Sequence, residues 1–474
     1  MLEAIQIDGA DTSLEEEALQ ELDDDLQGEL IRPTDEGYEQ ARKVWNGMID
    51  RYPALIVRCA DTDDVVRAVR FARQHNLLTA VRGGGHNVAG HGTQDGALVI
   101  DLSPMREVSV DADYRTVQAQ GGATLGDVDA ASQERGLAVP LGVVSKTGIA
   151  GLTLVGGLGW LRNRYGLTVD SLLEAEMVTA DGQVVIANKD SNADLLWGLQ
   201  GGGGNFGVVT KFTYQAYPVG PDVFFMMVFY SAENDREVLR AFRDFVAQAP
   251  DRVTLLADLG MFPEGSEFPE ELQGTAFTAL VGLYAGLAGD GERAMAPLRG
   301  IAEPLMDISG PMEYVEVQRL FDADYPDGSR YYWKSTNLME LTDAGIDRLL
   351  EHTRKQPSQR STVDLWPLGG AVKRVPKDAT AFFGREAAYV LNPEANWADP
   401  ADDQVNIQWV RDLIESMEEF SDGGRYLNFQ GFQEEGDAMM EAAFGASYAR
   451  LAELKRKYDP DNFFRLNQNI KPAS

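Results

Sequence analysis

Short apolar runs alternate with an amphipathic stretch early in the chain. The runs ALIVRC (54–59), LLTAVR (77–82) and ALVIDLS (97–103) have the length and continuity of buried strands. Between the first two, DTDDVVRAVRFARQHN (61–76) begins with acidic residues and repeats apolar residues at helical spacing, as an amphipathic helix does. The pattern predicts strands and helices in alternation, with the second strand running directly into Gly83.

The next hundred residues continue the mixed pattern. Residues 108–123 predict short β segments, and TLGDVDAASQERG (124–136) predicts a helix with Thr124 as its N-cap. Residues 171–187 predict two strands around the turn Asp181-Gly182. Helices and strands therefore share one domain up to about residue 217.

From about Pro218 the chain alternates strands with long amphipathic helices. FFMMVFYS (224–231), followed by NDREVLRAFRDFVAQAP (234–250), is one such pair. We expect residues 218–425 to form a second α+β domain, with an antiparallel sheet flanked by helices. Residues 1–30 are expected to be an acidic N-terminal arm, helical or disordered.

Charge excludes several classes of partner. The 474 residues include 75 acidic and 42 basic ones, giving a formal net charge of −33. Such a chain is repelled by nucleic acids and by anionic membrane surfaces, so neither is expected as a main partner. Because the acidic residues are spread along the whole chain, adaptation to high salt is favoured over an ordinary acidic cytosolic protein.

Export and metal binding are not indicated. The acidic N-terminus lacks the basic start and apolar stretch of a secretory signal, and no apolar run approaches the ~20 residues that cross a membrane. A cytoplasmic protein is therefore expected. The single cysteine, Cys59, forms neither an internal disulfide nor a Cys-rich metal site, and no metal site is predicted.

The first candidate for chemistry is RGGGHN (82–87), directly after a predicted strand. Three glycines allow a sharp turn with consecutive N–H groups exposed, and such a nest binds phosphate oxygens. His86 then stands beside whatever the nest holds. The alternative is a glycine-rich turn with an incidental histidine.

A second glycine-rich stretch, GVVSKTGIAGLTLVGGLG, covers residues 142–159. Glycines at this density weaken a helix or strand unless something must approach the backbone closely, such as a flat ring or a diphosphate. A flexible linker does not fit, because the spacers, among them Ile149, Leu154 and Leu158, are apolar.

A third run, GGGGNFG (201–207), contains the spacing GxGxxG at 202–207. The dinucleotide fingerprint should follow a strand and open a helix, whereas here a strand, VVTKFTY, follows. A Rossmann NAD site is therefore rejected.

In this order the motifs resemble the vanillyl-alcohol-oxidase (PCMH-type) FAD-binding fold and, within it, the berberine-bridge-enzyme-like oxidoreductases, which include 6-hydroxynicotine oxidase and oligosaccharide oxidases. The resemblance runs from about Arg32 to Pro472 and includes the terminal YDPDNFFRLNQNI (458–470). It implies an FAD-binding domain of two α+β subdomains over 31–217 and a substrate-binding domain over 218–425. A C-terminal segment, 426–474, is expected to return to the FAD-binding domain.

The resemblance also implies FAD bonded covalently to His86 through the 8α-methyl group of the flavin. Many relatives carry a second link, from a cysteine to flavin C6, but the matching position here is Val144, so attachment through His86 only is expected. Thr147 and Gly148 are expected near the ring edge. The predicted cofactor-binding residues are His86, Arg82, Gly83, Gly84, Gly85, Asn87, Gly90, His91, Pro140, Gly142, Val144, Thr147, Gly148, Gly151, Leu152, Gly156, Gly157, Gly159, Val208, Asn467 and Asn469.

The catalytic base is not evident from the motifs. Relatives often place a tyrosine where this chain has Phe429, in the stretch YLNF (426–429), and phenylalanine has no proton to exchange. Asn428 can still hydrogen-bond a substrate.

The predicted strand RYYWK (330–334) offers alternatives. Alternation places Tyr332 and Lys334 on one face, where a buried lysine would polarise a neighbouring phenol, although ordinary aromatic packing explains the same pattern. Trp366 is a further candidate for the wall of the pocket. The candidate catalytic residues are Tyr332, Lys334 and Asn428.

The resemblance implies an FAD-dependent oxidase or dehydrogenase. It would oxidise a hydroxyl-bearing small molecule, such as a sugar, an alcohol or a phenolic natural product, by hydride transfer to the flavin, with dioxygen or another acceptor taking the electrons. Two alternatives stay open: oxidation of a C–N bond, as in the 6-hydroxynicotine-oxidase type, and a non-catalytic flavin-binding protein. A monomer or homodimer is expected.

Overall fold

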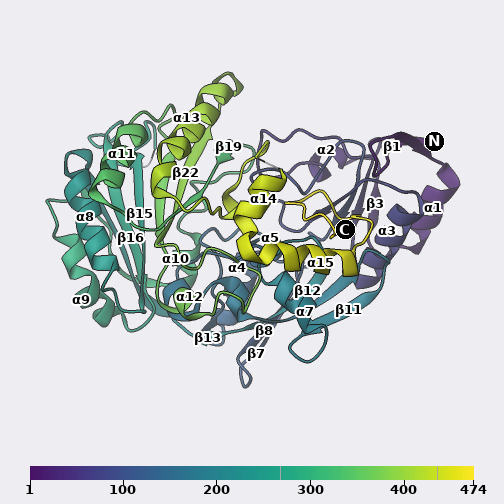
Figure 1. Ribbon diagram of the computed structural model, residues 1–474, viewed down its shortest axis with the longest axis horizontal. Coiled ribbons are helices and arrows are strands. Elements are labelled where there is room, and N and C mark those ends of the chain that lie inside the picture. The colour runs from purple at the N-terminus through teal and green to yellow at the C-terminus, as the bar shows by residue number, and fades with distance from the viewer. Residues whose placement is uncertain (267, 435, 474) are drawn as a thin grey trace.

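The computed structural model describes residues 1–266, 268–434 and 436–473. Two sheets of the first domain lie at one end of an elongated molecule, and a large sheet with its helices lies at the other (Figure 1). In the four-stranded sheet the order is β3-β4-β6-β5, with β4 and β5 both parallel to β6. The strands are β3 (Glu29–Ile31), β4 (Leu55–Arg58), β5 (Thr79–Arg82) and β6 (Leu98–Asp101).

The helix α3 (Thr62–Gln74) makes the crossover between β4 and β5. Its N-cap is Asp61, whose side chain accepts a hydrogen bond from the Asp64 backbone, so the acidic start seen in the sequence caps the helix. The strands and helix predicted between residues 54 and 103 are confirmed.

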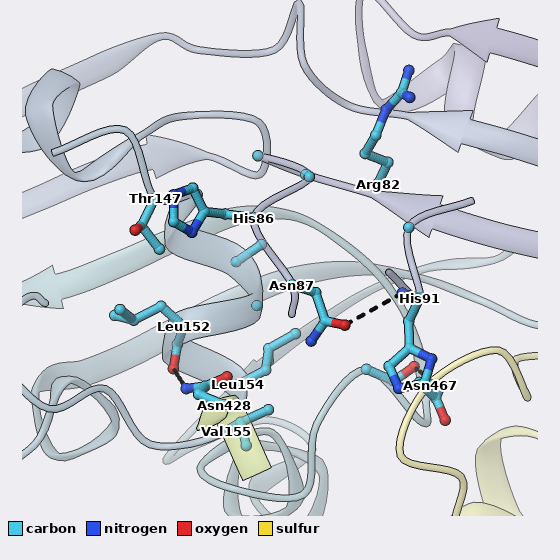
Figure 2. Close-up of a pocket in the computed structure, with 18 of the residues that line it drawn as sticks. Arg82, His86, Asn87, His91, Thr147, Leu152, Leu154, Val155, Asn428 and Asn467 are labelled. Atoms are coloured by element: carbon cyan, nitrogen blue, oxygen red, sulfur yellow. Dashed lines mark hydrogen bonds between the residues drawn. The ribbon is translucent and has the colours of Figure 1, made fainter. Parts of the chain in front are cut away.

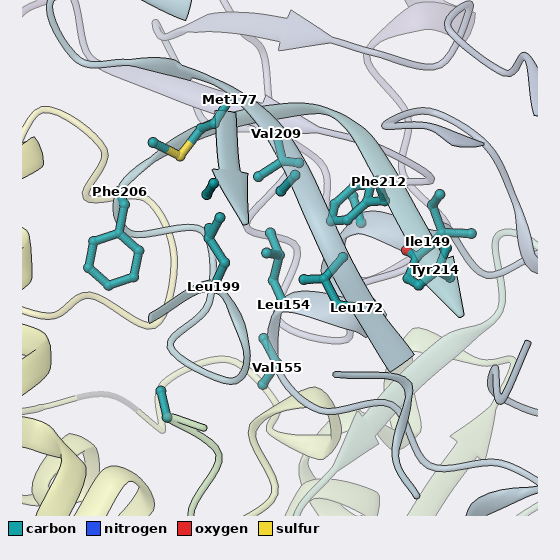
Figure 3. Close-up of a cluster of buried hydrophobic side chains, with 14 of the residues drawn as sticks. Ile149, Leu154, Val155, Leu172, Met177, Leu199, Phe206, Val209, Phe212 and Tyr214 are labelled. Carbon is teal, nitrogen blue, oxygen red and sulfur yellow. The ribbon is translucent and has the colours of Figure 1, made fainter. Parts of the chain in front are cut away.

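The second sheet of this domain is antiparallel, in the order β11-β10-β12-β8-β7. The predicted helix is α4 (Leu125–Gln133), where Thr124 and Asp127 form a reciprocal capping box. Figure 3 shows the core behind this sheet, where Phe212 and Tyr214 pack near Ile149 and Leu154 of the glycine-rich segment. The strands are β7 (Val108–Asp111), β8 (Thr116–Gln120), β10 (Leu172–Thr179), β11 (Val184–Asn188) and β12 (Gly207–Gln215).

The N-terminal thirty residues contain the acidic helix that was expected, but they do not form an arm. Strands β1 (Leu2–Ile5) and β2 (Asp11–Leu14) pair as a hairpin, and α1 (Glu16–Asp25) follows. Leu14, Leu19 and Leu22 are buried in the same core as β4 and α3. The segment is therefore a packed part of the fold, because its few apolar residues find partners in the first sheet.

The large sheet belongs to the second half of the chain. Its strands follow the order β17-β14-β16-β15-β21-β22-β19, and every neighbouring pair is antiparallel. The α+β fold with an antiparallel sheet is confirmed. The strands are β14 (Asp222–Ser231), β15 (Val253–Met261), β16 (Ala276–Tyr284), β17 (Met306–Asp307), β19 (Arg330–Trp333), β21 (Thr362–Pro367) and β22 (Tyr389–Trp397).

Period-two alternation gives this sheet two different faces. Leu255, Ala257 and Leu365 belong to the face covered by helices (Figure 1). Leu256 and Trp366 belong to the opposite face, which packs against Trp160 of the first domain. The helices are α8 (Asp235–Val246), α9 (Ala288–Arg299), α11 (Asp343–Thr353) and α13 (Asp403–Ser416).

The C-terminal segment crosses back to the first domain (Figure 1). It carries α14 (Asp437–Phe444) and α15 (Tyr448–Tyr458). Buried Lys455 donates to the carbonyl oxygens of Asn205 and Phe464 at 2.7 and 2.9 Å and pairs with Asp459. These contacts fix the chain end beside the third glycine run. None of the helices in the described part of the chain is long and apolar enough to cross a membrane.

Candidate active site

A cavity of about 260 Å³ lies where the two glycine-rich segments meet the large sheet and the C-terminal segment. Figure 2 shows its first-domain side, with His86 and Thr147 toward one end and His91 and Asn467 toward the other. Contributions come from within residues 79–92, 142–158, 204–209, 426–429 and 464–468, together with side chains of the large sheet.

The glycines give this cavity its shape in two ways. Gly84 and Gly148 belong to different loops, and a Cβ on Gly84 would lie 2.5 Å from the backbone nitrogen of Gly148, so only glycine lets the loops meet. Gly151 and Gly204 instead face open space, with nothing within 4 Å of an added Cβ. The lining therefore leaves room for a flat group to approach the backbone.

His86 faces the cavity as a neutral imidazole. Its ring stacks on Trp45 with centroids 4.1 Å apart and an interplanar angle of 15°. Burial lowers the pKa of His86 to about 4, because the charged form loses its hydration. Its Nε2 is buried and has no hydrogen-bond partner among the residues that the structure describes. The neutral ring has a free nitrogen lone pair, which bond formation to carbon requires.

Arg82 also lines the cavity, but its guanidinium is committed elsewhere. It forms a buried ion pair with Asp101, at 2.7 Å, and donates to the carbonyl oxygen of Ala41 at 2.6 Å. Figure 2 shows the Arg82 side chain directed away from His86. Its contribution is to hold the start of the glycine loop.

Asn87 and Asn467 supply amides to the cavity. The Asn87 side-chain oxygen accepts from the His91 backbone at 3.3 Å. The Asn467 amide donates to the carbonyl oxygens of Gly204 and Phe464, while its Oδ1 is buried without a partner in the described chain. That free acceptor suits a polar edge of a cofactor.

Most of the predicted cofactor-binding residues line this cavity. They are Arg82, Gly83, Gly84, Gly85, His86, Asn87, His91, Gly142, Val144, Thr147, Gly148, Gly151, Leu152, Val208 and Asn467. Outside the lining lie Gly90, Pro140, Gly156, Gly157, Gly159 and Asn469.

Glycines outside the lining serve close packing between protein segments. A Cβ on Gly159 would lie 1.5 Å from the carbonyl oxygen of Leu141, and one on Gly157 would lie 2.1 Å from the Thr168 hydroxyl. Gly156 similarly faces Phe382. The density of glycine in this stretch therefore has two causes, which the sequence does not separate.

Tyr332 and Lys334 are not brought to the cavity. Alternation correctly places them on one face, where both bind Glu434: the Tyr332 hydroxyl donates to one carboxylate oxygen, and the Lys334 ammonium lies 2.6 Å from the other. Arg411 completes the cluster. Neither residue lines the cavity, so their catalytic assignment is not retained. The opposite face carries Trp333, which does line it.

Asn428 lies on the cavity wall beside Tyr426. Its amide donates to the Tyr426 hydroxyl at 3.0 Å. It also donates to the Leu152 carbonyl oxygen at 3.2 Å, as Figure 2 shows. The Tyr426 hydroxyl also accepts from the backbone N–H groups of Gly157 and Leu158. These bonds tie the stretch 426–429 to the glycine-rich segment and turn the Phe429 ring toward Trp366.

Glu394, in the middle of β22, is the titratable residue that the sequence analysis missed. It is 2% exposed, lines the cavity, and accepts a hydrogen bond of 2.7 Å from the Tyr325 hydroxyl. Burial raises the pKa of this carboxyl to about 8. The sequence contains a signal for it, because Asn392, Glu394 and Asn396 occupy alternate positions of one segment. In a strand such residues share one face, and in β22 that face is buried.

The cavity fits a flavin dinucleotide on its own chemistry. A glycine nest faces one part of it, the neutral imidazole of His86 faces another, and apolar side chains such as Leu152 and Val155 exclude water between them. At the C-terminal side lies Oδ1 of Asn467, an amide acceptor without a partner in the described chain. These residues would hold a pyrophosphate, a flat ring and a polar ring edge.

Comparisons with known proteins agree with this description. The family model for an FAD binding domain matches residues 53–188, and the model described as berberine and berberine like matches residues 425–471. The chain is 32% identical to the FAD-linked oxidoreductase pgmH of Aspergillus terreus, over 98% of this chain and 97% of that protein. It is 30% identical to (R)-6-hydroxynicotine oxidase of Paenarthrobacter nicotinovorans, over 94% and 97%.

Solved structures show the same fold. The crystal structure of 6-hydroxy-D-nicotine oxidase from Arthrobacter nicotinovorans superposes with a TM-score of 0.85 at 28% identity, covering 94% of this chain and 98% of that one. Chitooligosaccharide oxidase gives 0.84 at 23% identity, covering 96% and 100%. Fold and cavity thus define a flavoprotein with a PCMH-type FAD-binding domain. The chain belongs to the berberine-bridge-enzyme-like family of FAD-linked oxidoreductases, and FAD is its cofactor.

Proposed function

We propose that the enzyme carries FAD bonded covalently through His86 and oxidises a hydroxyl-bearing small molecule, such as a sugar, an alcohol or a phenolic compound, by hydride transfer to the flavin. The observation that carries this proposal is Glu394, a buried carboxyl with a raised pKa in the same cavity as His86. Bound FAD supplies the acceptor for the hydride, and dioxygen or another acceptor then takes the electrons.

Glu394 would accept the hydroxyl proton as the substrate C–H bond breaks. A base works best when its pKa lies near the operating pH, and a value of about 8 meets that condition. The Tyr325 hydroxyl orients the carboxylate through its 2.7 Å hydrogen bond. Glu394 therefore fills the role left open by Phe429 and counts against a non-catalytic flavin-binding protein.

Attachment through His86 is supported by the state of its ring. The imidazole is neutral, held against Trp45 and unpartnered at Nε2 among the described residues. The imidazole of His86 would supply the nitrogen that holds the flavin at its 8α-methyl group. Val144, which also lines the cavity, has an aliphatic side chain that forms no second link.

The decisive test measures flavin that stays with the polypeptide after acid denaturation. Wild type and His91→Ala should retain yellow colour and flavin fluorescence, whereas His86→Ala should release or lack the flavin. His75→Ala, a histidine at the end of α3, is the matched control and should behave as wild type. Release of flavin from the wild type would refute the covalent attachment.

The same holoenzyme then distinguishes alcohol from amine oxidation. Hydroxyl compounds and amines are offered without oxygen, and loss of the flavin absorbance identifies the donor. Bleaching by alcohols or sugars supports the proposal. Bleaching by amines alone would establish the alternative, oxidation of a C–N bond. The similarity to (R)-6-hydroxynicotine oxidase is the reason to test this alternative.

A further inference from the structure

A second cavity, of about 360 Å³, adjoins the flavin cavity on the side of the large sheet. The two share Val143, Tyr325 and Trp366 in their linings. A substrate that reaches the flavin therefore has room to extend into this second space, and the residues there would contact the part of the substrate that does not react.

Carboxyl groups gather on the floor of the second cavity because of strand register. Asp258 of β15 lies directly opposite Asp364 of β21, and both line the cavity. Asp364 in turn lies opposite Asn392 of β22, two residues before Glu394, so all these side chains share one face. Two ionised carboxylates directly opposite on neighbouring strands repel each other, so this pair must take up either protons or a compensating cation.

One carboxylate oxygen in this lining, Oδ1 of Asp258, is buried and lacks a partner within the described ranges. The neighbouring carboxyl group of Asp364 is 4% exposed, and no ion pair to a cationic side chain is found for it in the described chain. The nearby Trp366 indole N–H interacts with Asp364, but as a neutral donor it does not balance the charge of a carboxylate. Native proteins seldom leave buried polar atoms unsatisfied, and the Asp258 oxygen faces a space large enough for a ligand.

The walls of the cavity are aromatic. Phe229, Phe277, Trp366 and Trp397 contribute to it, with Tyr331 at the side of the flavin domain. Rings of this kind attract a cation through their faces. Arg360 is the cationic side chain found in the described lining, and it is exposed, so water screens its charge.

From these contacts we infer that the second cavity binds a protonated nitrogen of the substrate, held by Asp258 and Asp364 away from the carbon that is oxidised. The inference rests on the proposed function and narrows it: the substrate is a hydroxyl-bearing organic cation, such as an amino alcohol or an amino sugar, whose hydroxyl carbon meets the flavin near Glu394. A neutral or anionic compound of the same size would leave the carboxyl groups unsatisfied.

The cavity should bind cations more tightly as the pH rises. Burial raises the pKa of Asp258 to about 7 and that of Asp324 to about 6, and raises that of Asp364 well above its usual range. These groups therefore hold protons at low pH and must lose them to pair with a cation. The other charged or titratable groups around them are Glu264, Tyr325, Tyr331, Arg354, Arg360 and Glu394.

The test compares three probes that share a phenol ring: tyramine, 4-ethylphenol and 3-(4-hydroxyphenyl)propionate. Binding to the flavin-loaded enzyme is measured by calorimetry without oxygen at about pH 8. Tyramine should bind at least roughly tenfold more tightly than either other probe. Asp258→Asn and Asp364→Asn should each remove most of this preference and leave 4-ethylphenol within about twofold of its wild-type affinity. Asp113→Asn, an exposed aspartate in a distant turn, should change nothing.

The wild type alone provides a second measurement, which does not depend on whether a variant folds. Its affinity for tyramine should rise between about pH 6 and about pH 8, with release of protons, while that for 4-ethylphenol stays constant. Equal affinities for the three probes, undetectable binding of tyramine, or preference for the anion would overturn the cation site. Wild-type protein without flavin would instead overturn the proposed function, so the two failures are distinguishable.

Discussion

At the scale of single residues, Glu394 leads to the sharpest prediction about catalysis. We expect Glu394→Gln to slow reduction of the flavin by a hydroxyl substrate ~10²-fold or more, because glutamine accepts no proton. In the wild type the rate should increase with pH up to about 8, the value to which burial raises the pKa of this carboxyl, because only the ionised form is a base. Stopped-flow absorbance without oxygen measures both.

A matched variant separates this role from a change in charge. Glu386→Gln removes an exposed carboxylate and should leave the rate and its pH dependence unaltered. If Glu394→Gln retains flavin and reduces it at the wild-type rate, another group accepts the proton. The pH profile of the Glu394→Gln variant is also informative. If Glu394 had only a structural role, the variant would react more slowly, but its rate would still rise toward pH 8.

The residues predicted from sequence are those whose chemistry is local. His86 follows three glycines, and Gly148 lies in a second glycine-rich segment. These contiguous motifs were enough to identify both residues, and both line the cavity. Glu394 and Tyr325 meet only because β22 and the loop after α10 (Tyr314–Arg319) are adjacent in the folded chain, which no motif records. For Tyr332 the alternation of the strand was right, but which face meets the flavin depends on packing between domains.

At the scale of elements, the packing of α4 against α10 leads to a prediction about stability. Asp129 of α4 is 1% exposed, and the one hydrogen bond found for its carboxyl group in the described chain comes from Gln318 of α10. Burial raises its pKa to about 7. The folded protein therefore binds this proton more tightly than the unfolded chain, whose aspartates titrate near 3.9, and the stability that Asp129 contributes is lost as the pH rises from about 4 to about 7.

Asp129→Asn removes the charge and keeps the shape, so it should stabilise the protein only where Asp129 would be ionised. The variant and the wild type should unfold alike at about pH 4, whereas at about pH 8 the variant should be more stable by up to roughly 4 kcal/mol. Denaturant unfolding at several pH values measures the difference. Glu134→Gln, an exposed carboxylate next to the same helix, is the control. A stability gain that is independent of pH would contradict the assignment to ionisation.

Elements with a long periodic signal were predicted well, and short ones were not. Helix α3 repeats its apolar residues over more than three turns and is capped by its own acidic start, so local preference and packing agree. The hairpin of β1 and β2 has strands of only four residues, and its stability comes from burying Ala4 and Leu14 against the first sheet. A segment that depends on distant partners looks like a polar arm in the sequence.

At the scale of the whole molecule, the site exists only where separate parts of the chain converge. The first domain supplies the glycine nests and His86, the large sheet supplies Glu394, and the C-terminal segment closes the cavity with Asn428 and Asn467. Resemblance to a family predicted this convergence, because it carries information about topology that composition and periodicity lack. The boundaries set at 31, 218 and 426 stay predictions.

The charge of the whole molecule leads to a last prediction. A formal net charge of −33 makes the folded state repel itself, and this repulsion weakens as the Debye length falls from about 10 Å at 0.1 M salt to about 3 Å at 1 M. Between about 0.05 M and about 1 M NaCl the thermal unfolding midpoint of the holoenzyme should therefore rise by several degrees, most steeply at the low end.

At about pH 5, nearer the sequence pI of about 4.4, the net charge is smaller and the same salt series should give a smaller rise. Sucrose separates charge screening from general stabilisation by an excluded solute. It stabilises proteins by exclusion from their surface at any net charge, so its effect should be similar at both pH values. If the thermal unfolding midpoint at neutral pH does not change with NaCl concentration, the acidic surface is an ordinary solvated one and not an adaptation to salt.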